Sequence, residues 1–523
     1  MQDHLIRVRH AGGRCLAEPY HDFVSKAVLL PLSSEELRQG HLRLANTLEA
    51  SPQADVETLA MHFLAAGEHR KAVGYLTSAG LKASGALAFE QAASLFRMSL
   101  ELQDADSTAA AGLWGHLGEA LANAGRGREA AEAYLRAMVH ASSAEAVRFR
   151  QSAAQEYLRN GHYQEGITVL EGLLKASGIR LTSSRSLSLL SALFHKALLK
   201  LRGTRFTERK PEEIPHEELG RLDTYWVATM GLAAGDIVRA ADLQARQLLL
   251  NLRTGELSRL IRASAYEAIF RSASGNRKEK GILKFLRLTV QHAQRLGDPG
   301  AECMAQLALG IAMTNLGHWR KAAETLERAE ALIKENAKGL AYELRSAQAF
   351  ALINHYPLGN LRLIARRLPT LFREAEETGD LLFLANLKTG AAFIHYLARD
   401  KPAFAREDIR RTMDKLSTEG FAHQKYLQLV AYGNIDLYAG NLVDGWAEFN
   451  LRWKELRATR LMMAQAIRIT CLELRARFAL ALLAASKDPL ERKRLRSQAQ
   501  KDRRAIQRER TAYGTGLALR LDA

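Results

Sequence analysis

The sequence predicts an all-α fold in which pairs of helices repeat along the chain and stack into a superhelix. The first observation is a set of turn-forming residues that recur at nearly constant spacing between Gly235 and Gly440. The second is the small number of prolines, 10 in 523 residues, which favours long uninterrupted helices. Each repeat in such a stack packs only on its neighbours, so a chain of this length needs no single large core. The predicted turns are at Gly67, Gly125, Gly161, Gly235, Gly275, Gly317, Gly359, Asp400 and Gly440.

The N-terminal segment, residues 1–52, differs in pattern from the rest of the chain. Branched and alternating residues flank Gly12-Gly13, which predicts a β-hairpin. Pro19 then introduces a helical stretch that ends near Leu30. The following Ser33-Ser34-Glu35-Glu36 is a helix-start signal, with a serine cap and an acidic first turn.

A first array of helical hairpins is predicted for residues 53–175. Its clearest copy spans 113–137 and matches the tetratricopeptide pattern. In that pattern, Trp-x2-Leu-Gly lies on the first helix of a pair, and Ala-x3-Tyr or Ala-x3-Phe lies on the second. The residues that define this copy are Trp114, Leu117, Gly118, Gly125, Ala130 and Tyr134.

Residues 176–215 are predicted to form a basic insertion followed by a linker that contains Pro211 and Pro215. The spacing between the predicted turns at Gly161 and Gly235 is nearly twice the spacing between the later turns. This stretch of the chain is therefore also compatible with two repeat units.

A second array, with units of about 40 residues, is predicted for 216–485, and a basic capping helix or tail for 486–523. Its clearest copy contains Gly310, Gly317 and Ala322. Glycine and alanine at these positions let the two helices of a pair approach closely. Because a standard tetratricopeptide unit has about 34 residues, we expect longer helices here but still one helix pair per unit.

The net charge of +17 is concentrated in two segments. Residues 175–210 carry a net charge of +8, and residues 487–510 carry +6. The rest is nearly neutral, which argues against nucleic acid as a partner along the whole superhelix. For the first segment three interpretations remain open: a solvated linker helix, an intramolecular dock, or contact with nucleic acid or an anionic membrane. The candidate contacts for an anionic partner are Arg202, Arg205, Arg209 and Lys210.

The sequence contains none of the motifs searched for that carry chemistry. A phosphate loop, a kinase glycine-rich loop, a serine nucleophile elbow and zinc-ligand spacings are all missing from it. We therefore expect no catalytic residue, no cofactor site and no metal site. Three widely spaced cysteines argue for a reducing compartment, and no apolar run is long enough to span a bilayer. Together these features predict a cytoplasmic protein.

Several further segments resemble one family. They are Glu18-Pro19-Tyr20-His21-Asp22, Leu59-Ala60-Met61-His62-Phe63, Leu222-Asp223-Thr224-Tyr225-Trp226, Arg295-Leu296-Gly297-Asp298-Pro299 and Ala365-Arg366-Arg367-Leu368-Pro369. The chain resembles the C-terminal region of large bacterial signalling proteins. Those proteins join a serine/threonine protein kinase, or a nucleotide cyclase, to an AAA-like ATPase and a tetratricopeptide-like tail.

The resemblance implies that residues 1–32 are the remnant of a winged helix, with the hairpin as its wing. In the family, the kinase and ATPase modules precede this point, so their catalytic residues have no counterparts here. This predicts either a truncated gene product or upstream domains on a separate chain. The implied function is a non-catalytic protein-interaction and sensor module that regulates a kinase–ATPase in cis or in trans and binds no ATP by itself. The alternative is a DNA-associated transcriptional regulator that uses the winged-helix remnant and the basic segments.

Overall fold

The computed structural model of the chain describes residues 6–11, 14–19, 22–103, 108–182, 184–233, 235–275, 279–336, 339–416 and 422–522. These residues form two compact units, Met1–Ala120 and Leu121–Ala523. The boundary lies within helix α6 (Thr108–Asn123).

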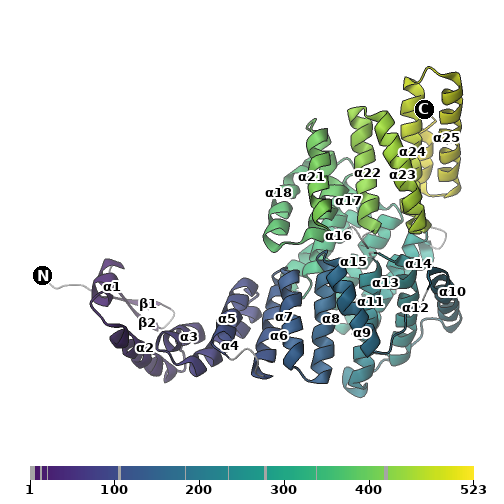
Figure 1. The fold of residues 1–523 in the computed structure, drawn as a ribbon. Helices are drawn as coiled ribbons and strands as arrows, with labels where there is room; N and C mark the ends of the chain where they lie inside the picture. Colours follow the sequence, from purple (N-terminus) through teal and green to yellow (C-terminus); the bar gives the residue numbers. More distant parts are fainter. Residues whose placement is uncertain are drawn as a thin grey trace. The chain divides into compact units, whose positions relative to one another are not determined.

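The smaller unit begins with a pair of strands and continues as consecutive helices (Figure 1). Strands β1 and β2 pair antiparallel, with Ile6 opposite Pro19, whereas the predicted Gly12-Gly13 turn lies outside the described residues. The predicted helix start at Ser33 is confirmed, because its side chain and that of Glu36 form a reciprocal capping box. The elements are β1 (Ile6–Ala11), β2 (Arg14–Pro19), α1 (Asp22–Leu29), α2 (Ser34–Glu49), α3 (Val56–Ala65), α4 (His69–Gly85), α5 (Phe89–Glu101) and the first part of α6.

The larger unit consists of helices, most of which pack on their neighbours in the sequence. The helices are α7 (Gly127–His140), α8 (Ser143–Arg159), α9 (Tyr163–Ala176), α10 (Arg185–Arg202), η1 (Pro211–Glu213), α11 (His216–Ala233), α12 (Ile237–Thr254), α13 (Leu257–Ala273), α14 (Glu279–Leu296), α15 (Pro299–Asn315), α16 (Trp319–Asn336), α17 (Ala341–His355), α18 (Leu361–Thr378), α19 (Leu381–Leu387), η3 (Lys388–Ala392), α20 (Phe393–Leu397), α21 (Pro402–Lys415), α22 (Ala422–Ala439), α23 (Leu442–Ala458), η4 (Leu461–Met463), α24 (Gln465–Ala485), α25 (Pro489–Arg508) and α26 (Ala512–Arg520). The predicted all-α helical-repeat class is confirmed.

Most of the predicted turn residues adopt the left-handed backbone conformation that ends a helix. Positive φ angles are found at Gly67, Gly125, Gly161, Gly275, Gly317, Gly359, Asp400 and Gly440. The regular step in the sequence therefore marks real inter-helix turns.

The stretch between Gly161 and Gly235 does not contain two repeat units, the alternative with which its length was also compatible. Leu198, the midpoint, lies inside α10, and α10 packs on α12 without forming a hairpin with α11. Helix α11 packs directly on α8 and α9, and the Gln151 side chain donates to the Gly220 carbonyl at 2.9 Å. The stack thus continues from α9 to α11, and α10 is an insertion at its outer side.

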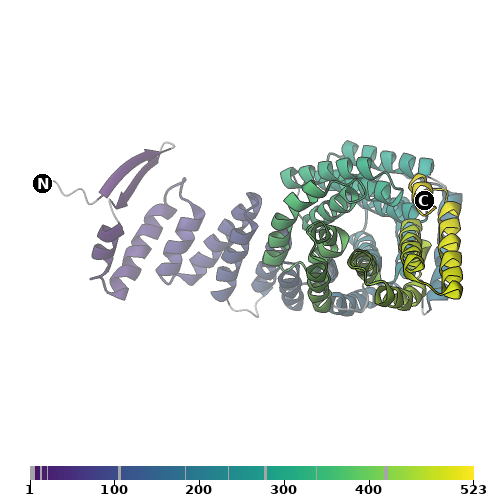
Figure 2. The same ribbon diagram turned by 90° about the horizontal axis from the view of Figure 1, so that it is seen from above.

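The larger unit curls so that helices far apart in the sequence meet, as the view from above shows (Figure 2). Gly161, in the turn between α8 and α9, lies so close to Leu416 that a Cβ atom there would come within 2.8 Å of its side chain. The Arg159 guanidinium donates to Glu343 at 2.9 Å across the same junction. This closure brings two walls of helices to face one another.

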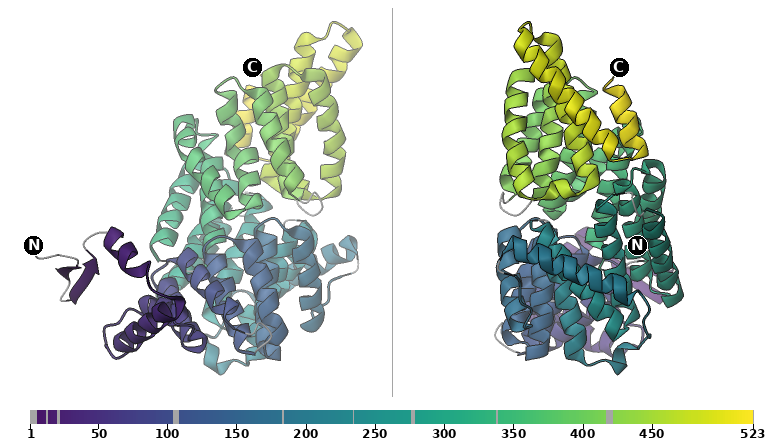
Figure 3. Two further views of the ribbon diagram at one scale, coloured as in Figure 1. Left: turned by 60° about the vertical axis from the view of Figure 1, so that its left-hand side comes forward. Right: turned by 90° about the vertical axis from the view of Figure 1, so that its right-hand side faces the viewer.

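The C-terminal helices fold back onto the repeats. Helices α24 and α25 run side by side (Figure 3), joined by the buried Asp502 carboxylate, which accepts from Arg475 Nε at 2.8 Å. On α26, the Tyr513 ring lies 5.4 Å from that of Trp319, at the start of α16. The basic C-terminal region is therefore part of the folded larger unit.

Candidate functional site

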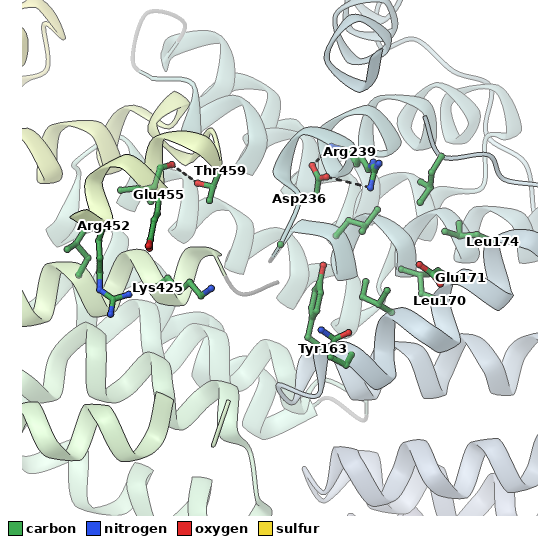
Figure 4. A pocket seen from close by; sticks show the side chains of 17 residues that line it. Tyr163, Leu170, Glu171, Leu174, Asp236, Arg239, Lys425, Arg452, Glu455 and Thr459 are labelled. Carbon is green, nitrogen blue, oxygen red and sulfur yellow. Dashed lines mark hydrogen bonds and ion pairs between the residues drawn. The ribbon is translucent and has the colours of Figure 1, made fainter. Parts of the chain in front are cut away.

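The larger unit contains a cleft of about 460 Å³, shown in Figure 4. Helix α9 and the α11–α12 junction form one wall, and α22 and α23 form the other. Its apolar lining consists of Ile167, Leu170, Leu174, Leu181, Leu232, Leu429 and Leu456. The two walls come from segments far apart in the sequence, so the cleft is formed by the curl of the larger unit (Figure 2).

Polar and charged side chains line the rest of this cleft. Asp236 accepts from the backbone N–H of Arg239 at 3.2 Å and also pairs with its guanidinium at 3.8 Å. Burial, together with the nearby Asp236 carboxylate, raises the pKa of Tyr163 above its ordinary value. On the facing wall, Lys425 and Arg452 add positive charge. The cleft therefore combines an apolar floor with charges of both signs.

A second, inner cavity of about 270 Å³ is lined by residues of α8, α11, α13, α15, α17, α19 and α22. Its main polar feature is the ion pair between Arg159 and Glu343, whose side chains are 8% and 2% exposed. The Arg159 guanidinium also lies 4.7 Å from the ring centroid of Tyr342. One edge of this pair is unsatisfied, because Glu343 Oε2 and Arg159 Nε have no hydrogen-bond partner among the described residues.

Two further carboxylates stand beside this pair. Burial raises the pKa of Glu156 to about 7, and the Arg159 charge opposes that rise. Burial also raises the pKa of Asp380 to about 6, although its side chain accepts from the Phe383 backbone N–H at 2.8 Å. Carboxyl groups with such pKa values exchange protons near neutral pH.

The repeat-defining residues lie in helices and turns, and none of them lines the cleft or the inner cavity. Trp114, Leu117 and Gly118 lie on α6, Gly125 in the turn after it, and Ala130 and Tyr134 on α7. Gly310 lies on α15 and Ala322 on α16, with Gly317 between them.

Two of these glycines permit close approach. A Cβ atom at Gly310 would lie 2.5 Å from Leu326 Cγ, and one at Gly317 would lie 2.3 Å from the Tyr513 ring. Gly310 therefore brings α15 and α16 together, and Gly317 also provides the space into which α26 docks.

The four basic residues proposed as anionic-partner contacts differ in their surroundings. Arg202 donates to the carbonyls of Arg205 and Leu252, both at 2.9 Å, and Arg209 donates to the carbonyl of Glu213. Arg205 and Lys210 are exposed. Two of the four basic side chains thus help to fold the insertion.

Sequence reasoning missed the charged residues of both cavities. Arg159 lies directly before the Asn160-Gly161 turn, and nothing in its local pattern separates it from a solvated arginine. Among the described residues, no group of three histidine, cysteine, aspartate or glutamate side chains is arranged to hold a metal ion. None of the described helices combines the length and apolar character needed to cross a bilayer.

No protein-family model matches the chain, and no curated protein is significantly similar to it in sequence.

Proposed function

We propose that this chain is a non-catalytic, tetratricopeptide-like interaction and sensor module whose cleft takes an amphipathic segment of a partner protein. The observation that carries the proposal is the cleft between α9 and α22–α23, with its apolar floor and charged sides. Amphipathic helices dock in grooves of this kind through an apolar face, and charges beside the groove select the partner.

The proposed sensing role depends on the two walls of the cleft, which come from distant parts of the chain. An occupant that contacts both Tyr163 on α9 and Arg452 on α23 would favour the closed superhelix over more open ones. A ligand shifts such an equilibrium only by its difference in affinity for the two states, and contact with both walls supplies that difference.

We further propose that the regulated partner is a serine/threonine kinase–ATPase, attached in cis or bound in trans in the cytoplasm. This part rests on the sequence resemblance described above. We therefore expect the purified chain neither to bind nor to hydrolyse Mg-ATP. Equilibrium dialysis would measure binding, and phosphate release would measure hydrolysis. Stoichiometric binding of Mg-ATP would contradict this part of the proposal.

The cleft is tested by selecting peptides from a displayed random library on the immobilised chain. We expect the enriched peptides to be amphipathic and to bind at least about tenfold more weakly to a Lys425→Glu/Arg452→Glu variant, because both cations line the cleft. Lys454→Glu is the matched control, since Lys454 is exposed on α23 but does not line the cleft. No enrichment, or equal binding to both variants, would overturn the proposal.

A further inference from the structure

Helix α10 has its polar side turned inward and its apolar side turned outward. The inward side docks on α12 through the buried Asp242 carboxylate. This group accepts from Ser191 Oγ at 2.7 Å, lies 3.1 Å from His195 Nδ1 and pairs with Arg246 at 2.6 Å. Leu199 adds an apolar contact with the core of α12 and α13.

The outward side carries a continuous row of large apolar side chains at helical spacing. The row consists of Leu187 (51% exposed), Leu190 (64%), Leu193 (56%), Phe194 (65%), Leu198 (42%) and Leu201 (85%). From the first to the last it spans roughly 21 Å at a rise of about 1.5 Å per residue. Apolar surface gathered in this way marks an interaction site more often than scattered exposed leucines do.

The charges around the row all have the same sign. Between Glu171 and Glu208 the sequence contains no aspartate or glutamate. Lys200 precedes Leu201 on the helix and is exposed, and Arg202 and Arg205 follow at its C-terminal end. The Arg202 guanidinium is turned toward α12, where it donates to the Leu252 carbonyl, so Lys200 and Arg205 are the exposed cations next to the row.

We propose that this face of α10 binds in the plane of an anionic lipid surface. An exposed apolar row with Lys200 beside it and Arg205 beyond its C-terminal end fits a flat interface, where the apolar side chains enter the acyl boundary and the cations meet lipid phosphates and carboxylates. A second copy of the chain would bring like charges together, which disfavours self-association through this face. The site lies on α10 and is independent of the proposed cleft function.

The experiment is sedimentation of the full chain with two kinds of vesicle, phosphatidylcholine alone and phosphatidylcholine mixed with phosphatidylserine. We expect binding to the anionic vesicles only, weakening as salt is raised. Leu190→Ser/Phe194→Ser should weaken it by roughly tenfold or more, because two apolar side chains no longer enter the lipid. Lys200→Glu/Arg205→Glu should also weaken it and flatten its salt dependence.

Val443→Ser/Leu490→Ser is the matched control, because these side chains are 72% and 78% exposed and lie on other helices; it should bind vesicles like the wild type. Circular dichroism of each variant checks that the helices are retained. Equal binding to both vesicles, or no vesicle binding, would overturn the proposal. Binding of α10 to an acidic amphipathic peptide without vesicle binding, or dissociation of a dimer by Leu190→Ser/Phe194→Ser, would overturn it in favour of a protein partner.

Discussion

At the scale of single residues, charge is concentrated beside the inner cavity, where burial makes charge costly. Glu156, Arg159, Glu343 and Asp380 stand close together, and only part of their hydrogen-bonding capacity is used. Buried ion pairs of this kind contribute little net stability, but removing one partner is costly.

Glu156 should make stability depend on pH. Its pKa rises from 4.5 to about 7 on folding, so the folded protein keeps the proton where the unfolded chain has lost it. The free energy of unfolding should therefore fall as pH rises through this interval, by up to about 3 kcal/mol. Urea denaturation at a series of pH values would measure it.

Glu156→Gln should remove this part of the pH dependence, because the amide does not ionise. Glu171→Gln, at an exposed position of α9, should leave the wild-type slope unchanged. A Glu156→Gln variant with the wild-type slope would show that this carboxyl group ionises normally in the folded state.

Gly310→Ala should destabilise the larger unit by about 1–3 kcal/mol. The added methyl would lie 2.5 Å from Cγ of Leu326, which is fully buried, so that side chain or the two helices must shift. Thermal unfolding followed by circular dichroism would measure the loss. Gly220→Ala is the control, because no atom lies within 4 Å of a Cβ there, so helix propensity alone should stabilise it by up to about 1 kcal/mol. Equal effects at the two glycines would contradict the packing assigned to Gly310.

At the scale of elements, the turns between helices could be predicted from the sequence, but the packing of α10 on α12 could not. A glycine that ends a helix leaves a local signal, so the regular step of the turns was readable. The position of α10 depends on Asp242 and Arg246, which lie on α12, and no local pattern indicates that contact. For the same reason the long step from Gly161 to Gly235 resembled two repeats.

Asp242→Ala should release α10 from α12. The change removes the acceptor of Ser191 and leaves Arg246 without its carboxylate partner. Hydrogen–deuterium exchange in peptides covering residues 185–202 should rise strongly, while exchange in α15 and α16 stays at the wild-type level. Asp444→Ala, at an exposed position of α23, should change neither region. Unchanged protection of α10 would mean that the apolar contact of Leu199 alone holds it.

At the scale of the whole molecule, the predicted repeat class holds, but the residues that define the repeats do not form the candidate site. They are small or apolar because they fix helix-to-helix distances, as Gly310 does. The cleft arises from closure of the larger unit, which joins α9 to α23, two helices that lie far apart in the sequence. A repeat pattern reports contacts between neighbours, so it predicts a superhelix without predicting how far the superhelix closes.

Double electron–electron resonance between spin labels on the two walls tests this central claim most directly. Labels at Glu171→Cys and Glu455→Cys, both exposed in the cleft, would be placed in a chain whose Cys15, Cys303 and Cys471 are replaced by serine. A peptide selected for cleft binding should narrow the distance distribution and favour its short component, because the occupant contacts both walls. A distribution that stays the same when the peptide is saturating would contradict the sensing role.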